Sequence, residues 1–315
     1  MDPALQKTLN LFVENTAELD SAFRFQKPPS RQSSALLFTL EGKRANCDAV
    51  KECSKMIKRH TELLSPLRLR KHLSLSTYLS FYSNPENVFS NSLAMFQPLK
   101  KVFPYYGGTD HAIVAIMIAS ACKPEHYPAA TQRVDALFNR TMKKLFIVKE
   151  CCNAVFITLL TLSRLDVDTA LGLYEEQYAW IKNERSFFGI PDLALLSALT
   201  GEGITASARI LQMKSSLDVL GFPKTHYDYI HRCVKLLALV HSKPELLVKD
   251  LRDAHSFLIG FRDSSLCTTD FYLLYFMSAA LVALHHSKME NGGVPSPLVA
   301  AIAPAMSLQL VDSWS

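Results

Sequence analysis

Phe81-Tyr82-Ser83-Asn84-Pro85-Glu86 is the stretch that most directly indicates the fold, because it ends one apolar helical run and starts the next. The same pattern, a break followed by Pro-Glu, returns in Ala121-Cys122-Lys123-Pro124-Glu125 and in Val240-His241-Ser242-Lys243-Pro244-Glu245. Breaks of this kind recur at intervals of roughly 40 residues, which is the period of stacked helical hairpins. The sequence therefore predicts an all-α protein built from helix pairs.

The composition supports this fold class. Hydrophobic residues make up 49% of the 315 residues and charged residues 20%, which is enough apolar material for a large core. The chain has 11 glycines, fewer than the regular turns of a β-sandwich or barrel require. We expect about 14 to 15 helices, arranged as antiparallel hairpins stacked in a right-handed, solenoid-like array that is either open or closed.

The runs at 113–121 and 154–162 are apolar on all sides, so neighbouring helices must cover them from several directions. No linker rich in Gly, Ser or charge interrupts the chain. We therefore expect a single helical-repeat-like domain over residues 1–315, with a weak seam near residues 187–191.

Capping and breaking residues mark several helix ends. Asp2 and Asn84 are suitable N-caps, each followed by a proline at the first helical position, and Gly42 suits a helix C-terminus. Pro98 is expected to kink or end its helix. Predicted helices cover 3–23, 31–40, 48–64, 66–82, a segment from 85, a segment from about 110 to 121, 128–146, 150–163, 168–183, 191–200, 205–220, 225–241, 244–261, 270–286 and 297–311.

The cysteines and the hydropathy of the chain indicate the cellular compartment in which the protein is expected. The seven cysteines are odd in number and include no Cys-x-x-Cys pair, which favours free thiols in a reducing, cytoplasmic setting. The N-terminus lacks the basic start and apolar stretch of a signal peptide. The longest uncharged apolar run, 271–284, is shorter than the ~20 residues that cross a bilayer. We expect a buried core helix there and no membrane association.

The common catalytic signatures are missing from the chain, including Gly-x-Gly-x-x-Gly, the Walker loop, Gly-x-Ser-x-Gly and His-Glu-x-x-His. We assign no catalytic residue and no cofactor, although a site assembled from distant positions would leave no such signature. His226 and His231 are five residues apart and face different sides of a helix, while His285 and His286 are adjacent. Neither pair suits a metal, so we expect no metal site.

Positive charge is the first functional signal. The net charge is +5, and the segment 43–72 holds nine basic residues against three acidic ones. Four of these cations, which we call the basic ridge, recur at helical spacing on one face, and two more follow in the next segment: Lys51, Lys55, Lys58, Arg59, then Arg68 and Arg70. Such a ridge suits an acidic protein or the phosphates of a nucleic acid. A solvated helix face is the alternative, and the absence of interleaved aromatics argues against single-stranded nucleic acid.

The loop before the apolar run at 112–121 is the second candidate. Tyr106, Asp110 and His111 combine an aromatic ring, a helix N-terminus and an imidazole around two glycines, which could form a small-ligand or enzyme pocket. The alternative is a hinge between hairpins in which Asp110 caps the following helix.

The order of segments resembles the bacterial domain-of-unknown-function family four thousand and three. The resemblance rests on 34–43, on Arg140-Thr141-Met142-Lys143-Lys144 leading into 145–162, and on 173–199, and it extends over nearly the whole chain. The family pattern includes a His-Pro-Phe and acidic element after Met-Lys-Lys, where this chain has residues 145–150. The resemblance implies no established activity.

These observations favour a binding or scaffold module with a protein partner, since stacked helices form extended contact surfaces. An enzyme or small-ligand binder with a pocket near Tyr106–His111 is the first alternative. Nucleic-acid binding by the basic ridge is the second. The discriminating observations are a polar cavity around Asp110 and His111 for the first, and a steep loss of affinity with salt for the second.

Overall fold

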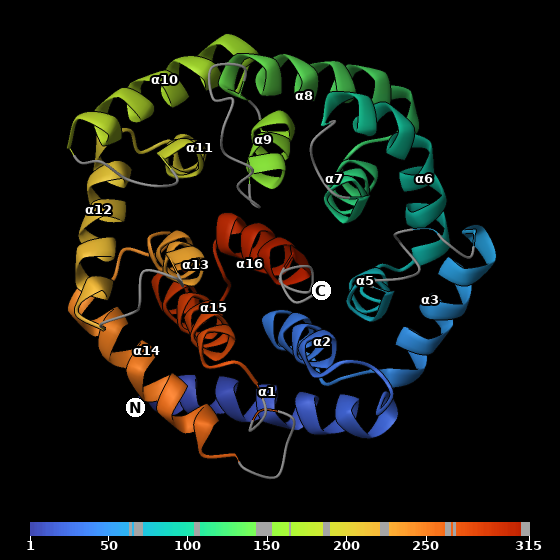
Figure 1. Ribbon diagram of the computed structural model, residues 1–315, viewed down its shortest axis with the longest axis vertical. Helices are drawn as coiled ribbons and strands as arrows, with labels where there is room; N and C mark the ends of the chain where they lie inside the picture. The colour runs from blue at the N-terminus through green and yellow to red at the C-terminus, as the bar shows by residue number, and fades with distance from the viewer. Residues whose placement is uncertain are drawn as a thin grey trace. The chain divides into compact units, whose positions relative to one another are not determined.

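A computed structural model describes residues 1–62, 65, 72–103, 108–142, 153–163, 165–184, 190–220, 227–261, 266 and 269–309 (Figure 1). Within these residues the chain forms 15 α-helices and one short 3-10 helix, and it contains no β-strand. The all-α prediction is confirmed. None of the described helices combines the length and the apolar character that a bilayer crossing requires.

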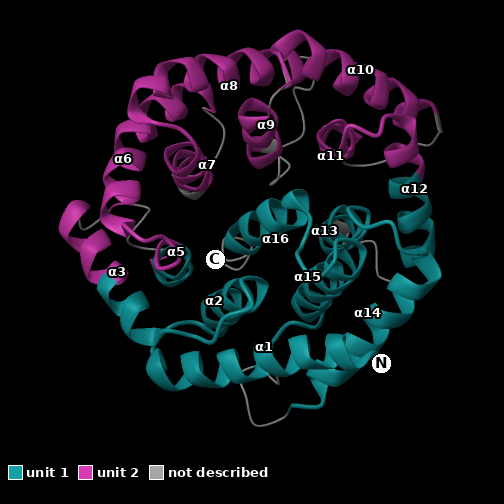
Figure 2. Ribbon diagram, turned by 180° about the vertical axis from the view of Figure 1, so that it is seen from behind, with its two compact units in different colours: residues 1–52, 73–78, 209–315 teal, residues 53–72, 79–208 magenta. Residues whose placement is uncertain are grey.

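The chain divides into two compact units (Figure 2). Unit 1 comprises residues 1–52, 73–78 and 209–315, and unit 2 comprises residues 53–72 and 79–208. Residues 187–189 of the seam proposed near 187–191 lie outside the described residues, and the seam stays a prediction. Organisation of residues 1–315 as a single domain stays a prediction.

Unit 1 is built around one helix that is buried over most of its length. Its helices are α1 (Pro3–Ala22), α2 (Pro28–Leu40), α13 (Tyr227–Leu237), α14 (Pro244–Ile259), α15 (Phe271–Glu290) and α16 (Pro297–Gln309), with parts of α3 (Cys47–His60), α5 (His72–Leu79) and α12 (Ile204–Asp218). α15 packs against α1, α2, α13, α14 and α16. Its buried residues run without interruption from Phe276 to Ser287, because the segment is apolar on every face.

Unit 2 contains two rows of helices and a short connector, together with the remaining parts of α3 and α12. One row contains α6 (Pro85–Val102), α8 (Tyr127–Met142) and α10 (Val167–Glu184), and the other contains α7 (Gly108–Ala121), α9 (Asn153–Leu162) and α11 (Ile190–Thr200), with η1 (Pro124–His126) before α8. Successive helices within each row are in contact, and each hairpin joins one row to the other. The row of α7, α9 and α11 is buried on most sides, as expected for its apolar sequences.

Stacking in sequence order therefore holds within unit 2 but does not describe unit 1. There α1 contacts α14 and α15, and α2 contacts α16, so the first helices of the chain pack against the last ones. A solenoid brings together only neighbouring repeats. The right-handed, solenoid-like array is not confirmed.

Most predicted helix starts agree with the structure. The Asp2 carboxylate accepts hydrogen bonds from the N–H groups of Ala4 and Leu5 at 2.7 and 3.2 Å, and Asn84 accepts one from Asn87 at 3.0 Å. Pro98 lies inside α6, which continues to Val102. α2 begins at Pro28, earlier than the predicted residue 31, because prolines are tolerated in the first turn of a helix.

Candidate functional site

The basic ridge lies on α3, an amphipathic helix. Val50, Cys53 and Ile57 are buried on one face. The opposite face exposes the four predicted cations, of which the first belongs to unit 1 and the rest to unit 2: Lys51, Lys55, Lys58 and Arg59. Arg68 and Arg70 lie outside the described residues. The helical spacing therefore places the four side chains on the solvent-facing side of one helix, as predicted.

Charges near the ridge are only partly compensated. Lys51 Nζ lies 3.2 Å from Asp48 Oδ1, an exposed pair one turn apart. Lys58 and Arg59 form no ion pair with any residue that the structure describes, and both lie in the last turn of α3, where positive charge complements the helix dipole. The C-terminal end of α3 therefore presents the strongest uncompensated positive charge of the ridge.

The second candidate group is partly in the core. Tyr106 lies outside the described residues, and Asp110 occupies the first turn of α7, half-buried. His111 is buried, and its Nε2–H donates a hydrogen bond to the Phe103 carbonyl at 2.9 Å. Its ring also makes edge contact with Phe96 at a centroid distance of 5.9 Å. His111 therefore packs between α6 and α7, and the predicted ligand pocket around it stays a prediction.

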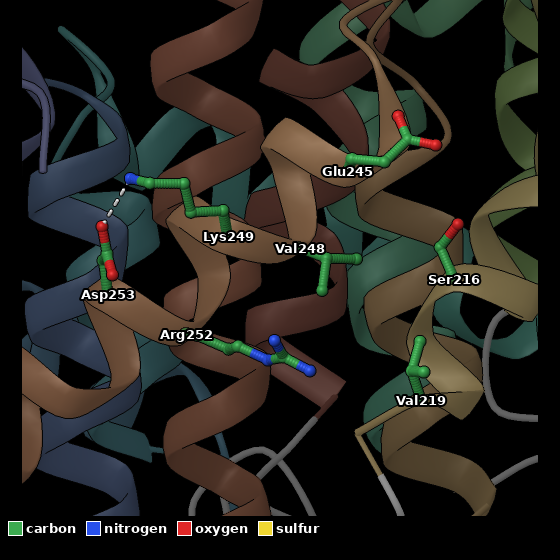
Figure 3. A pocket seen from close by; sticks show the side chains of 7 residues that line it. All are labelled: Ser216, Val219, Glu245, Val248, Lys249, Arg252 and Asp253. Atoms are coloured by element: carbon green, nitrogen blue, oxygen red, sulfur yellow. Dashed lines mark hydrogen bonds and ion pairs between the residues drawn. The ribbon is translucent and has the colours of Figure 1, made fainter.

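Unit 1 contains a shallow groove between α12 and α14 that the sequence did not suggest (Figure 3). Its volume is about 500 Å³, and its lining residues are Ser216, Val219, Glu245, Val248, Lys249, Arg252 and Asp253. The Lys249 ammonium lies 2.9 Å from Asp253 Oδ2, so those two charges neutralise each other. Arg252 points away from that pair (Figure 3). The i, i+4, i+7 spacing of charged residues on α14 was the available signal.

A chain of hydrogen-bonded side chains joins α14 to α15. His286 is buried, and its Nε2 lies 2.9 Å from Asp250 Oδ2. Its Nδ1 lies 2.9 Å from the Oγ of Ser242, a half-buried residue just before α14. Ser242 Oγ in turn lies 2.9 Å from Glu290 Oε1. Sequence reasoning considered His286 as a metal ligand and missed these partners, because they are 36 and 44 residues away along the chain.

Glu290, at the end of α15, also bonds to the backbone of the loop between α13 and α14. Its Oε1 accepts hydrogen bonds from the backbone N–H groups of His241 and Ser242, at 2.8 Å each. Its Oε2 lies 3.4 Å from His241 Nδ1. The carboxylate thus satisfies two backbone donors that precede the helix and would otherwise need water. In the part of the chain that the structure describes, no three His, Cys, Asp or Glu side chains are arranged to hold a metal ion.

The fold and these surfaces define an all-α protein with a charged helical face and a polar chain of side chains in unit 1. The chain belongs to the family described as protein of unknown function (DUF4003), whose model matches residues 15–203. The match confirms the resemblance drawn from the sequence over residues 15–203, whereas that resemblance was expected to extend over nearly the whole chain. No curated protein and no solved structure matches the chain.

Proposed function

We propose that this protein is a binding module that captures an acidic segment of a partner protein on α3. The observation that supports the proposal is the exposed face of α3, where Lys51, Lys55, Lys58 and Arg59 lie opposite a buried apolar face. The buried face anchors the helix, and the cations lie on its opposite, solvent-facing side. Such a face attracts an acidic partner and orients it on approach.

The dimensions of the ridge suit a short acidic segment. Consecutive residues rise 1.5 Å along a helix, so the cations from Lys51 to Arg59 extend over about 12 Å. A partner helix with acidic residues four apart would match this spacing. The exposed face of α3 contains no Phe, Tyr or Trp on which a nucleic-acid base could stack. A protein partner is therefore favoured over single-stranded nucleic acid.

The proposal places this binding in the cytoplasm. Cys233 is buried and free, and Cys47 and Cys122 are free and partly exposed. Three free thiols among the described residues fit a reducing compartment.

Charge reversal on the ridge tests the proposal. The variant Lys55→Glu/Arg59→Glu is expected to bind a fluorescent deca-glutamate peptide at least tenfold more weakly than the wild type, measured by anisotropy at low salt. Its melting temperature should change little, because exposed charges contribute about 0 to 1 kcal/mol each to folding. The matched control is Lys123→Glu, an exposed cation before η1, which should bind the peptide as the wild type does.

The same assay separates the alternatives. A single-stranded DNA oligonucleotide of equal charge should bind more weakly than the peptide, and a stronger, steeply salt-dependent affinity for it would favour nucleic acid instead. If the double variant and the wild type bind the peptide equally, α3 is not the contact surface. Capture of proteins from the native cell with the wild type and the double variant, followed by mass spectrometry, would then identify the partner.

A further inference from the structure

We propose that Ser242 is a latent nucleophile for ester hydrolysis, with His286 as its general base and Glu290 covering the site. This inference concerns unit 1 and goes beyond the proposed binding function. It rests on four side chains from α14, α15 and the loop before α14, which the fold brings together from positions up to 48 residues apart.

The geometry of the nucleophile and base is the first support. An activated serine requires a base within hydrogen-bond reach, and the base requires a third group that fixes its orientation. Ser242 Oγ and Asp250 Oδ2 each lie 2.9 Å from a nitrogen of the His286 ring, on opposite sides. His286 and Asp250 are both buried, whereas Ser242 is partly exposed to solvent. The order from surface to core is thus nucleophile, base and orienting carboxylate.

The hydrogen-bond inventory assigns the tautomer of His286. A carboxylate can only accept, so the bond to Asp250 requires the proton on Nε2. In the neutral ring, Nδ1 then carries the lone pair and faces the Ser242 hydroxyl. Lys249 Nζ lies 3.8 Å from Asp250 Oδ1, on the side of the carboxylate away from the oxygen that bonds to His286. In this structure the Ser242 hydroxyl donates to Glu290 Oε1, so His286 Nδ1 is placed to take that proton only once the Glu290 side chain has moved away.

Glu290 marks the place where an oxyanion would sit. Its Oε1 lies 2.9 Å from Ser242 Oγ and 2.8 Å from the backbone nitrogens of both His241 and Ser242. A tetrahedral intermediate on Ser242 needs N–H donors at this distance from its oxygen. The two backbone donors are therefore already aimed at one point beside the hydroxyl, and a carboxylate oxygen of the protein itself occupies that point.

The same carboxylate explains why the site is latent. An anion in the oxyanion position excludes the substrate carbonyl and competes with His286 for the hydroxyl proton of Ser242. Glu290 is the last residue of α15, and its side chain is 23% exposed. Gly292 and Gly293 follow with φ angles of 66° and 97°, which place the chain immediately beyond Glu290 in a turn. Displacement of the Glu290 side chain alone would uncover Ser242.

The chemical step balances without a cofactor. Ser242 Oγ attacks the ester carbonyl carbon while its proton passes to His286 Nδ1, and the oxyanion accepts from the N–H groups of His241 and Ser242. The bond from carbon to the leaving alkoxide then breaks, and His286 returns the proton to the leaving alcohol. Water then attacks the acyl carbon while its proton passes to His286 Nδ1, the bond from that carbon to Ser242 Oγ breaks, and His286 returns the proton to Oγ, which releases the carboxylic acid and regenerates Ser242.

A fluorophosphonate carrying a fluorophore tests the inference, because attack by an activated serine displaces fluoride and leaves a stable adduct. Glu290→Ala is expected to react at least tenfold faster than the wild type, with the adduct located on Ser242 by mass spectrometry. Glu290→Ala/Ser242→Ala should not react, whereas Glu290→Ala/Ser256→Ala, which removes an exposed serine of α14, should react like Glu290→Ala.

Two further variants separate positioning from packing. Asp250→Asn in the Glu290→Ala background should lower the reaction rate and change its pH profile, since Asp250 acts through His286. Lys123→Glu in the Glu290→Ala background should leave the reaction unchanged, and because the reaction and peptide binding are measured separately, failure of the binding proposal and failure of this one are distinguishable. If folded Glu290→Ala reacts no faster than Glu290→Ala/Ser242→Ala, the chain of hydrogen bonds only ties α14 to α15, and the proposal is wrong.

Discussion

Asn15 illustrates how one buried amide can hold a turn in place at the residue scale. Its Nδ2 donates to Thr39 Oγ1 and to the Lys43 carbonyl, each at 3.0 Å, and its Oδ1 accepts from the Ala45 N–H at 2.8 Å. Asn15 is fully buried on α1, among residues that are otherwise mostly apolar. The amide thus binds the segment that leaves α2 to the face of α1.

Asn15→Ala should therefore destabilise unit 1 by about 3 kcal/mol, since buried donors and acceptors that lose a partner cost about 1 to 3 kcal/mol each. Urea unfolding followed by circular dichroism would measure the loss. The matched control is Asn10→Ala, at an exposed position of the same helix, which should change stability by less than about 0.5 kcal/mol. Equal effects of the two substitutions would show that the Asn15 bonds contribute little.

Single residues were also where sequence reasoning reached its limit. The ridge cations were predictable because exposure of Lys51, Lys55, Lys58 and Arg59 follows from helical periodicity alone. His111 lies at the start of an apolar helix, but its burial against Phe103 depends on the angle at which α7 meets α6. The partners of His286 depend on the packing of α14 against α15, which no local pattern specifies.

At the scale of the element, turn chemistry explains why helix ends were predicted well. α11 ends at Thr200, and Gly201 follows with φ of 69°, in the left-handed region where an L-residue is strained. Gly172, by contrast, lies inside α10 on its exposed side, and a Cβ there would meet no atom within 4 Å. A side chain would therefore be accommodated at position 172, inside a helix, but would strain the backbone at position 201, just beyond a helix.

Gly172→Ala should stabilise unit 2 by about 1 kcal/mol, because alanine loses less backbone entropy in a helix. Gly201→Ala should destabilise it by about 1 to 2 kcal/mol, because alanine is strained at positive φ. Both helices belong to unit 2, and the fluorescence of Trp180 in α10 reports on their unfolding. Shifts of the same sign for both variants would contradict this explanation.

For the molecule as a whole, the buried histidines of unit 1 predict how its folding stability changes with pH. Burial, assisted by Lys235 and Lys214, lowers the pKa of His231 to about 4. Burial also lowers the pKa of His255 to about 4, and a hydrogen bond to the Phe271 carbonyl, which by itself raises the pKa, offsets this only in part. His231 lies on α13 and His255 on α14, where the His255 ring stacks on Tyr275 at a centroid distance of 3.6 Å.

Unit 1 should therefore lose stability as the pH falls below about 6.5. The unfolded chain binds protons near pH 6.5, whereas the folded chain does not until about pH 4, so protonation favours unfolding in that range. Between pH 7 and pH 5 the loss should be about 2 kcal/mol per histidine. Urea unfolding at both pH values would measure it, and His231→Gln/His255→Gln should reduce the difference. Equal stability of the wild type at both pH values would contradict the prediction.

The helices, the apolar runs that must be buried and the exposed face of α3 are all predictable from the amino-acid pattern, because periodicity and capping are local properties of the chain. The amino-acid pattern also indicates the family, through segments such as 34–43. No local pattern indicates that α1 and α2 pack against α14, α15 and α16, or that Ser242, His286 and Asp250 lie together; these contacts appear only in the folded chain. An apolar helix face must be covered by another helix, but the sequence of that face does not specify which helix covers it. Contacts between distant segments therefore depend on how the side chains of whole helices fit together.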